Sequence, residues 1–549
     1  MSPHPFSPAA RASALAELAA RPLDLLVIGG GITGCGIARH AALRGLRVGL
    51  LEKADFGFGT SSRSTKIIHG GIRYLQYGHI PLVRESARER WVLRRIAPHL
   101  VHPVAFVYPL YRGMNRLKYR IGFHLFDVLA GAAGDERHRM VDARETRTLV
   151  PDLRDELRGA GVYPEFITDD ARLTLENAMS AAMHGALVAN HAEVVELPRG
   201  RGAAGAVHIR DIARGLDLAA QASVIVNATG AWAERTLRLA GIEAPKHLVP
   251  SKGIHLLFHA ARLPLAGAAH LRTAAGREGL AIRRGDWVYV GTTDVESGDS
   301  LDHPRADAAA IDDVLRMARD CFPALDLTTA DVRGTWAGIR PLIAEAGRST
   351  RETSRRDEIW EHSDGLLSVV GGKLTTYRKM ADRVMARVLA RLDAKGDGPF
   401  DDDRSAHVPL PGGRLRGIAA DRFMARMAER FVSRGVEQAA ARRIAWLYGS
   451  RAERLLAFAD QDPAWLHPLG PGTPAVRAEA RLAVEEEMAL TLEDVLDRRL
   501  GLLLFSDDHG AAAAEEAANI LAERLGWDEP RRQAEISGYR VLARAYGPL

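Results

Sequence analysis

A short glycine-rich segment near the N-terminus has the spacing of a phosphate-binding turn. Residues 25–28 are typical of a buried strand, and Gly29, Gly31 and Gly34 follow it in a GxGxxG pattern. Gly29 permits the tight turn, Gly31 lets the backbone approach a pyrophosphate, and Gly34 allows close helix–strand packing. The next helix can donate its first N–H groups to phosphate oxygens. Glu52 ends the second strand, where its carboxylate can accept hydrogen bonds from ribose hydroxyls. The segment therefore predicts a dinucleotide site, the alternative being a glycine-rich turn without a ligand.

Two later segments repeat the arrangement of a strand that runs into a tight turn. Residues 224–226 precede Asn227-Ala228-Thr229-Gly230, and residues 366–370 precede Gly371-Gly372. A helix is expected over 373–392, and its first N–H groups can stabilise the negative charge of a reduced flavin. A simple NAD-binding domain is contiguous, whereas these two later segments would rejoin the dinucleotide-binding fold after long insertions. This arrangement favours FAD over NAD as the cofactor. Two ordinary core strands that end in turns are the alternative.

Longer motifs follow one another along nearly the whole chain. They are Gly59-Thr60-Ser61-Ser62, Ser64-Thr65-Lys66-Ile67-Ile68-His69-Gly70-Gly71-Ile72-Arg73-Tyr74-Leu75, Gly291-Thr292-Thr293-Asp294, Trp336-Ala337-Gly338-Ile339-Arg340-Pro341-Leu342, Gly371-Gly372-Lys373-Leu374-Thr375-Thr376-Tyr377-Arg378, Tyr448-Gly449-Ser450 and Glu493-Asp494-Val495-Leu496-Asp497-Arg498-Arg499. In content and order the chain resembles the FAD-dependent glycerol-3-phosphate dehydrogenases of the respiratory, aerobic type. It departs from them at Ile254, where the family often has Ser, and at Ser354, which both Arg355 and Arg356 follow.

The resemblance implies a reaction as well as a cofactor. It implies hydride transfer from carbon 2 of sn-glycerol 3-phosphate to FAD, release of dihydroxyacetone phosphate, and transfer of the electrons to a quinone. Two alternatives keep the flavin: an oxidase that uses oxygen, and a related flavoprotein that oxidises a 2-hydroxy acid or an amino acid. A third is a non-catalytic or nucleic-acid-associated protein, which only the pI near 9.2 favours. No nucleic-acid-binding module is recognisable, so no nucleic acid partner is expected.

The expected FAD-binding residues come from the glycine-rich turn and the family motifs. They are Gly29, Gly31, Ile32, Thr33, Gly34, Glu52, Thr60, Ser61, Ser62, Lys66, His69, Ala228, Thr229, Gly230, Trp232, Gly372, Lys373, Leu374 and Thr375. No metal ligand set is expected.

Binding the substrate's phosphate calls for guanidinium groups, which hold its oxygens in pairs. Arg73 and Arg340 are the leading candidates because both lie in Gly-flanked motifs at family substrate positions. The expected substrate-binding residues are Arg73, Tyr74, His255, Arg340, Arg355 and Lys373. His69, Arg73, Arg340 and Lys373 are the expected catalytic residues. His69 is the candidate base because an imidazole titrates near neutrality, with His255 as the rival.

These residues need an α/β scaffold. Residues 1–22 are expected to form a loose tail, and residues 23–400 an FAD-dependent oxidoreductase domain of alternating strands and helices. The FAD-binding Rossmann-like part is expected at about 23–98, 160–245 and 350–400. The inserted mixed-sheet substrate or cap part is expected at about 99–159 and 246–349. Residues 401–549 have helical spacing and are expected to form a C-terminal all-helical domain.

Composition limits the compartment and the partners. The 549 residues carry a formal net charge of only +5, which does not by itself indicate nucleic acid. The cysteines, Cys35 and Cys321, form no CxxC pair, which favours a reducing compartment. Residues 1–22 lack the apolar core of a signal peptide, and no apolar run reaches the ~18 residues of a membrane span. With the resemblance, this implies a cytoplasmic protein attached to the inner face of the cytoplasmic membrane. A homodimer is also possible.

Residues 112–130 are the candidate for that attachment. Their basic residues are Arg112, Arg116, Lys118 and Arg120, and their apolar residues at helical spacing are Leu117, Ile121, Leu125 and Val128. On a helix this gives an apolar stripe beside a cationic face, the pattern of a helix that lies in an anionic membrane surface. The alternative is an ordinary amphipathic helix whose apolar stripe packs on the protein's own core.

Overall fold

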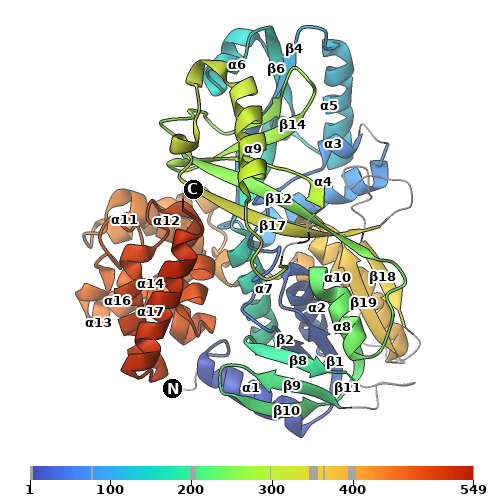
Figure 1. Cartoon of the computed structure of the whole chain (residues 1–549), viewed down its shortest axis with the longest axis vertical. Helices are drawn as coiled ribbons and strands as arrows, with labels where there is room; N and C mark the ends of the chain where they lie inside the picture. The colour runs from blue at the N-terminus through green and yellow to red at the C-terminus, as the bar shows by residue number, and fades with distance from the viewer. Residues whose placement is uncertain are drawn as a thin grey trace.

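The computed structural model describes residues 4–75, 78–197, 206–296, 298, 300–344, 357–362, 365–392 and 404–547; of these, the side chains of Arg73 and Asp135 are not described. The described chain has three parts: a dinucleotide-type domain, a second domain built on a large sheet, and a C-terminal group of helices (Figure 1). Within it, no helix has both the length and the apolar character that crossing a membrane requires.

A six-stranded sheet forms the centre of the first domain. Its order is β18 (Asp357–Glu361), β19 (Leu366–Gly371), β11 (Ala222–Asn227), β1 (Leu23–Ile28), β2 (Val48–Leu51) and β7 (Leu187–Ala189). Only β18 runs antiparallel to its neighbour. A parallel sheet is covered on both faces, which explains the continuous apolar runs of β1 and β11.

Different elements cover the two faces of this sheet. On one face, α2 (Ile32–Leu43), α7 (Asp170–Met183) and α10 (Tyr377–Arg391) bury apolar side chains against Leu25 and Val27. On the other face, Leu26 and Ile28 pack with α8 (Ala233–Leu239) and an antiparallel sheet of three strands. These strands are β8 (Ala192–Glu196), β9 (Val207–Asp211) and β10 (Leu216–Ala220).

The N-terminal residues differ from the expected loose tail, because residues 8–20 form helix α1 (Pro8–Ala20). Ser7 caps the helix by accepting a hydrogen bond from the backbone N–H of Ala10. Leu15 and Leu18 are buried against the second face of the sheet. Arg11 is buried too, and its guanidinium lies 2.6 Å from the Asp211 carboxylate. The buried charge of this helix therefore has a partner in β9.

A ten-stranded mixed sheet forms the second domain. The path along it runs β16 (Val295–Glu296), β12 (Leu248–His259), β15 (Trp287–Gly291), β14 (Glu278–Arg284), β13 (Ala268–Arg272), β4 (Val101–Tyr111), β6 (Leu157–Thr168) and β3 (Ile67–Ile68). In addition, β17 (Gly334–Ile343) pairs with β12 and β5 (Arg139–Val141) with β6. Helices α6 (Ala143–Leu149) and α9 (Ala308–Cys321) lie beside it, as do α3 (Ile72–Leu75), α4 (Ile80–Ile96) and α5 (Arg116–Ala130).

The C-terminal residues are helical. The helices are α11 (Ala420–Val432), α12 (Gln438–Tyr448), α13 (Ala452–Gln461), α14 (Arg477–Glu487), α15 (Leu502–Phe505), α16 (Ala514–Leu525) and α17 (Glu529–Arg544), and a π-helical segment, η10 (Asp494–Arg499), precedes α15. They enclose two apolar cores of their own. The predicted α/β architecture with a mixed second sheet and a helical C-terminal domain is confirmed. The numbered domain boundaries stay predictions, and 401 lies outside the described residues.

Helix α5 presents its predicted apolar stripe to solvent. Phe123 and Phe126 are its buried aromatic residues, and they pack toward the large sheet. The stripe residues are exposed: Leu117 by 64%, Ile121 by 60%, Leu125 by 41% and Val128 by 63%. The basic residues Arg112, Arg116, Lys118 and Arg120 are exposed as well. The alternative in which the stripe packs on the protein's own core is therefore wrong.

Candidate active site

A cavity of about 420 Å³ opens at the carboxyl ends of β1, β11 and β19. Gly29 has a φ of +108°, and a Cβ there would meet the Ala228 carbonyl oxygen at 2.7 Å. A Cβ at Gly34 would lie 1.9 Å from the Gly29 carbonyl oxygen, so only glycine fits. Gly31, the N-cap of α2, lines the cavity, and a Cβ there would meet only Ser61 Oγ, at 3.3 Å. The turn thus keeps backbone close to backbone and leaves its outer side open for a ligand.

Glu52 forms the side of this cavity that a ribose would contact. Its carboxylate accepts hydrogen bonds from the backbone N–H groups of Gly30 (2.6 Å) and Ala54 (2.9 Å). Burial raises the pKa of Glu52, while these two N–H groups oppose the rise. The turn, the N-terminus of α2 and this fixed carboxylate form the cradle that a dinucleotide needs, so the residues present fit FAD.

A second cavity, of about 610 Å³, continues from the first. Both cavities are lined by Thr60, Ser64 and residues 371–374. Gly371 and Gly372 have φ values of +72° and +84°, and they turn the chain sharply between β19 and the following helical segment. A cofactor in the first cavity can therefore present its reactive end to a molecule in the second.

Arg340 lies on β17 at the wall of the second cavity. Its guanidinium donates to the Thr293 carbonyl (3.0 Å) and to Thr292 Oγ1 (2.8 Å), and it forms an ion pair with Asp294. A Cβ at Gly253 on the neighbouring strand would lie 2.4 Å from the same guanidinium. The motif Gly291–Asp294 therefore fixes the direction of Arg340, and Gly253 leaves the space for it.

His255 lies on β12, two strand positions from Gly253, and lines the same cavity. Its ring stacks on Trp336 at 4.6 Å, and Nε2 lies 3.0 Å from Thr65 Oγ1. Burial, assisted by the positive charges of Arg340 and Lys66, holds the pKa of His255 well below its ordinary value. The imidazole is thus neutral near pH 7, and Nδ1 meets no hydrogen-bond partner within the described part of the chain.

His69, Tyr74 and Lys373 form a third group in this cavity. The rings of His69 and Tyr74 stack at 6.4 Å, and Lys373 Nζ lies 3.5 Å from the centre of the Tyr74 ring. The backbone N–H of His69 donates to Thr375 Oγ1 at 3.2 Å, which links the β3–α3 segment to the turn after β19. Residues from opposite ends of the oxidoreductase domain thereby meet in one place.

Glu165 holds the backbone beside His69. Both of its oxygens accept from the Gly70 N–H at 3.0 Å, and Arg90 donates to it at 2.8 Å. Glu165 lines the second cavity, as do Tyr163 and His270, whose side chains lie 2.7 Å apart. No sequence motif indicated these residues, because a single acid or aromatic in a strand is usually structural.

Most of the predicted cofactor residues line the first cavity. These are Gly29, Gly31, Ile32, Thr33, Glu52, Thr60, Ser61, Ala228, Thr229, Gly230, Trp232, Gly372, Lys373 and Leu374. His69 and Thr375 line the second cavity, whereas Gly34, Ser62 and Lys66 line neither. Lys66 is buried in an ion pair with Asp170 at 2.5 Å.

Two of the predicted substrate residues lie partly or wholly outside the described structure. Arg73 belongs to α3, but its side chain lies outside the described structure, and Arg355 lies outside the described residues altogether. The remaining predicted substrate residues, Tyr74, His255, Arg340 and Lys373, line the second cavity.

Further residues that the sequence did not indicate complete the first cavity. Lys53, Phe58, Glu193 and Arg235 belong to its wall. Lys53 directly follows the ribose-side Glu52, so its position carried a usable signal. The others reach the cavity through β8, α8 and the loop after β2, which only the fold brings together.

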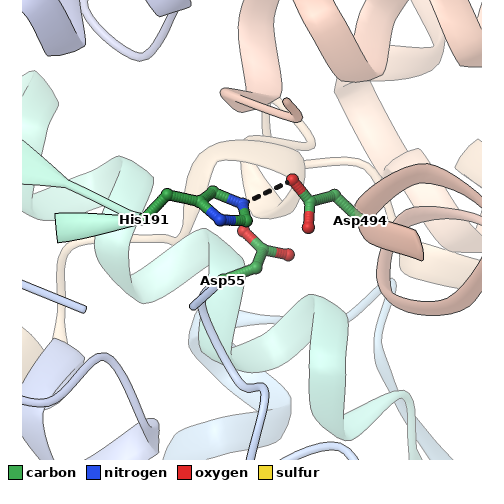
Figure 2. Close-up of side chains that lie close together, drawn as sticks. All are labelled: Asp55, His191 and Asp494. Carbon is green, nitrogen blue, oxygen red and sulfur yellow. Dashed lines mark hydrogen bonds and ion pairs between the residues drawn. The ribbon is translucent and has the colours of Figure 1, made fainter. Parts of the chain in front are cut away.

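A cluster of possible metal ligands lies elsewhere. Asp55, His191 and Asp494 place one ligand atom each within 4.8 Å of one another (Figure 2). Arg498 and Arg499 donate to Asp55, at 2.7 Å from Arg498 Nε and 2.9 Å from Arg499 Nη2. Two guanidinium charges thus already balance the carboxylates and make the cluster unfavourable for a cation.

Two family profiles match this chain in sequence. The first, described as FAD dependent oxidoreductase, matches residues 24–378. The second, described as the C-terminal domain of alpha-glycerophosphate oxidase, matches residues 404–532. Together they cover both the α/β part and the helical part of the chain.

Individual relatives and solved structures agree with these profiles. The chain is 37% identical to the aerobic glycerol-3-phosphate dehydrogenase of Bacillus subtilis over 99% of this chain and 98% of that protein. The glycerol-3-phosphate dehydrogenase of Bacillus halodurans, solved with FAD, matches with a TM-score of 0.83 and 32% identity over 99% of both chains. Glycine oxidase from Geobacillus kaustophilus matches at a TM-score of 0.52 and 20% identity, over 71% of this chain and 98% of that one, and so shares the fold.

Proposed function

Since this chain belongs to the FAD-dependent oxidoreductases and, among them, to the family of aerobic glycerol-3-phosphate dehydrogenases, we propose that it oxidises sn-glycerol 3-phosphate to dihydroxyacetone phosphate. The observation that carries the proposal is the joined pair of cavities, of which the second brings Arg340, His255 and Lys373 together. A small phosphorylated alcohol fits such a site, because cations bind its phosphate while a neutral imidazole accepts its proton.

The protein's own residues have separate tasks in this reaction. Bound FAD supplies the two-electron acceptor for the hydride that leaves carbon 2. Arg340, which Asp294 and Thr292 hold in place, presents a planar fork suited to phosphate oxygens, and Lys373 adds a point charge. Arg73 and Arg355 are further candidates for the phosphate.

His255 and His69 are the two candidate bases, because both line the second cavity. The lowered pKa of His255 leaves its imidazole unprotonated at neutral pH but also makes it a weaker proton acceptor than an ordinary imidazole. His69 lies in the same cavity beside Tyr74 and Lys373 and is the second candidate. Replacing each histidine with Gln separates the two, because loss of the base removes the proton-dependent limb of the rate profile.

Anaerobic mixing of the purified protein with glycerol 3-phosphate tests the proposal. Rapid bleaching of the flavin absorbance is expected, with dihydroxyacetone phosphate as the product. Glycine and glycolate are the alternative substrates to compare, because an amino acid or a 2-hydroxy acid would present its carboxylate to Arg340. Bleaching by either one, and not by glycerol 3-phosphate, would overturn the substrate assignment while leaving the flavin assignment intact.

The electron acceptor is a separate part of the proposal. We propose a quinone, which fits a protein that docks on a membrane through the exposed apolar and basic face of α5. Reoxidation by oxygen is the competing possibility. Turnover in air should release little hydrogen peroxide and should accelerate with a soluble quinone analogue. Stoichiometric peroxide without such acceleration would identify an oxidase instead.

We further propose that the protein is cytoplasmic and attached peripherally to the inner face of the cytoplasmic membrane. The exposed stripe of α5, flanked by Arg116, Lys118 and Arg120, supports this location. An anionic leaflet attracts such cations, and the apolar side chains can enter the headgroup region.

A further inference from the structure

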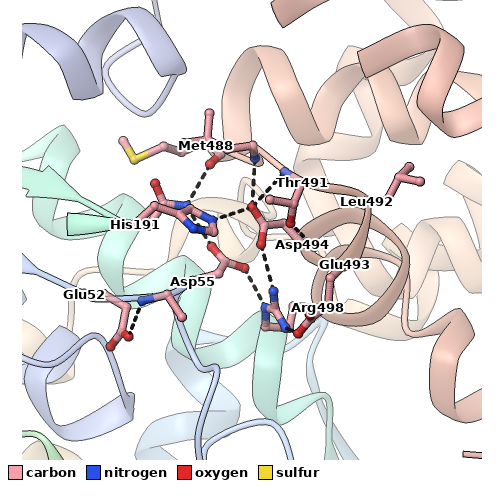
Figure 3. Close-up of polar contacts among 12 residues, drawn as sticks. Glu52, Asp55, His191, Met488, Thr491, Leu492, Glu493, Asp494 and Arg498 are labelled. Carbon is pink, nitrogen blue, oxygen red and sulfur yellow. Dashed lines mark hydrogen bonds and ion pairs between the residues drawn. The ribbon is translucent and has the colours of Figure 1, made fainter. Parts of the chain in front are cut away.

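The loop after β2, which begins at Glu52, contacts the C-terminal helical domain through Asp55. Asp55 is fully buried, and both of its oxygens are engaged (Figure 3). Arg498 Nε donates to Oδ2 at 2.7 Å, Arg499 Nη1 donates to Oδ2 at 2.5 Å, and Arg499 Nη2 donates to Oδ1 at 2.9 Å. Both arginines belong to η10, more than 440 residues further along the chain. A buried carboxylate between two guanidinium groups is a strong and directional contact.

A second contact joins the same π-helical segment to the turn between β7 and β8. His191 Nε2 lies 2.9 Å from Asp494 Oδ2, and the backbone N–H of His191 donates to the Ala54 carbonyl at 2.5 Å. Arg498 also donates to Asp494 at 2.8 Å. Asp55, Arg498, Asp494 and His191 therefore form one network across the junction between the domains, as Figure 3 shows.

Both anchored segments wall the first cavity. In the loop after β2, Glu52 accepts from the Ala54 N–H at 2.9 Å, and Lys53 and Phe58 line the cavity. The Arg498 guanidinium lies 5.8 Å from the centre of the Phe58 ring, behind that wall. After the β7–β8 turn, residues 192–195 line the cavity too. The C-terminal domain therefore contacts loop 52–58 from outside the cavity. The cavity-facing residues of the same loop would contact the adenosine half of the cofactor.

We propose that the C-terminal domain acts as a cofactor clamp, in which Arg499 and Arg498 hold Asp55 and thereby position the loop 52–58 for the adenosine half of FAD. The inference rests on the FAD site described above and adds a task for the helical domain. Because linkage is reciprocal, FAD binding also strengthens the contact between the two domains. Arg499 and Asp55 are positioning residues, since they touch the loop and not the cofactor.

The dissociation constant of FAD, measured on apoprotein by recovery of flavin absorbance, tests the clamp. Arg499→Met and Asp55→Asn are each expected to raise this constant at least tenfold and to weaken binding of ADP by a similar factor. The matched control is Glu176→Gln. Glu176 on α7 is fully buried as well, lies 3.0 Å from His99 and accepts a hydrogen bond from the backbone N–H of Gly412 at 3.1 Å. The variant weakens another buried contact with the C-terminal residues but does not touch loop 52–58, Arg498 or Arg499.

A role in folding alone predicts a different pattern. All three variants would then lower the melting temperature of the apoprotein, and none would change the dissociation constant measured well below that temperature. Clamp variants that bind FAD as tightly as Glu176→Gln would overturn the proposal. Wild-type protein that binds no FAD would instead overturn the cofactor assignment, so the two failures are distinguishable.

Hydrogen exchange of the wild-type protein tests the clamp without any variant. Addition of FAD is expected to slow amide exchange in residues 488–500, which lie in the C-terminal domain. Unchanged exchange there, with slowed exchange at residues 29–34 from the cofactor itself, would show that the two regions are not coupled.

Discussion

Arg340 is held in place by protein partners before any substrate arrives. Its contacts with Thr292, Thr293 and Asp294 fix the guanidinium at the cavity wall. Arg340→Ala should therefore remove a cation and also leave the Asp294 carboxylate without its partner, facing the substrate's phosphate. Losing one side of a buried charge pair costs about 2–5 kcal/mol, so kcat/KM for glycerol 3-phosphate should fall about 30-fold or more. The measurement is steady-state kinetics with a soluble dye acceptor.

Two further variants test whether the loss of activity in Arg340→Ala is specific to the Arg340 guanidinium. Arg340→Lys keeps the charge but loses the planar fork, so it should recover only part of the activity. Arg316→Ala removes an exposed arginine that pairs with Asp312 on α9, and it should leave kcat/KM unchanged. Every variant should retain its yellow colour. Near-normal activity of Arg340→Ala would place the phosphate clamp elsewhere, with Lys373 as the next residue to test.

His191 makes the domain junction sensitive to pH. Burial lowers the pKa of His191, but the Asp494 carboxylate and, more weakly, Asp55 outweigh burial, so the net pKa is raised. Arg498 opposes the rise, and Glu535 is the further acid that faces this histidine. A raised folded-state pKa means that the stabilisation is fully present below pH ~6.5 and is lost as the pH rises through the folded pKa.

His191→Gln tests this pH dependence. The amide keeps a hydrogen-bond donor near Asp494 but cannot titrate. The melting temperature of the wild-type protein should fall relative to that of the variant between pH 6 and pH 9. Since all other groups are shared, the difference between the two curves isolates His191. Parallel curves would mean that His191 carries the same charge in the folded and unfolded states.

At the scale of elements, the sequence predicted periodic segments well and their partners poorly. The strand, turn and helix over residues 23–43 follow from a local pattern, and the structure has them at β1 and α2. Helix α1 was missed, and its buried Arg11 pairs with Asp211, 200 residues away in the chain, which no local pattern predicts. The spacing of residues within a segment likewise does not predict that Asp55 pairs with Arg499, 444 residues further along the chain. Whether a charged side chain is buried depends on its partner in the fold, and the periodicity of the sequence does not identify that partner.

Helix α5 has the two faces that a membrane-surface helix needs. Phe123 and Phe126 attach it to the protein, while the stripe Leu117, Ile121 and Val128 stays exposed. Each of these apolar side chains contributes about 1.5–3 kcal/mol if it is fully buried in lipid. Each basic residue near an anionic leaflet contributes about 1 kcal/mol, and salt weakens that part. The wild-type protein should therefore float with anionic liposomes, and part of the binding should resist high salt.

Two triple variants of α5 separate the two contributions. Arg116→Glu with Lys118→Glu and Arg120→Glu should abolish flotation at low salt. Leu117→Ser with Ile121→Ser and Val128→Ser should leave only salt-sensitive binding. Val541→Ser, at an equally exposed position on α17, is the control and should float normally. Activity with a soluble acceptor should persist in every variant. Normal flotation of both triple variants would exclude α5 as the docking element.

At the scale of the molecule, one cavity depends on segments from most of the chain. The first cavity is lined by residues from Ile28 to Leu374, many of them in turns that follow strands which are neighbours only in the folded sheet. The motifs predicted many of these residues, because each turn repeats a local pattern. The walls formed by Phe58 and Arg235 depend on the three-dimensional arrangement of loops and sheets. A ligand in this cavity therefore stabilises the fold as a whole.

Two glycines of the GxGxxG turn, Gly31 and Gly34, allow the stabilisation of the fold by FAD to be measured. The Cβ of Gly31→Val would meet only Ser61 Oγ, at 3.3 Å, so the apoprotein should lose about 1 kcal/mol, the size of a helix-cap effect. The side chain should occupy the space of the pyrophosphate, so the protein should be colourless. Saturating wild-type protein at 100 times the dissociation constant should add about 2.7 kcal/mol of stability, and Gly31→Val should lose this increment.

Gly34→Ala should behave in the opposite way, which makes the pair diagnostic. Its methyl group would lie 1.9 Å from the Gly29 carbonyl oxygen, so the backbone must shift and the apoprotein itself should be destabilised. Overpacking of this kind costs about 1–3 kcal/mol. Thermal unfolding of the wild-type protein and of both variants, each with and without FAD, gives the six melting temperatures that are needed. If Gly31→Val keeps the full FAD-dependent rise, the pyrophosphate does not pass this turn, and the position of the cofactor in the fold must be reassigned.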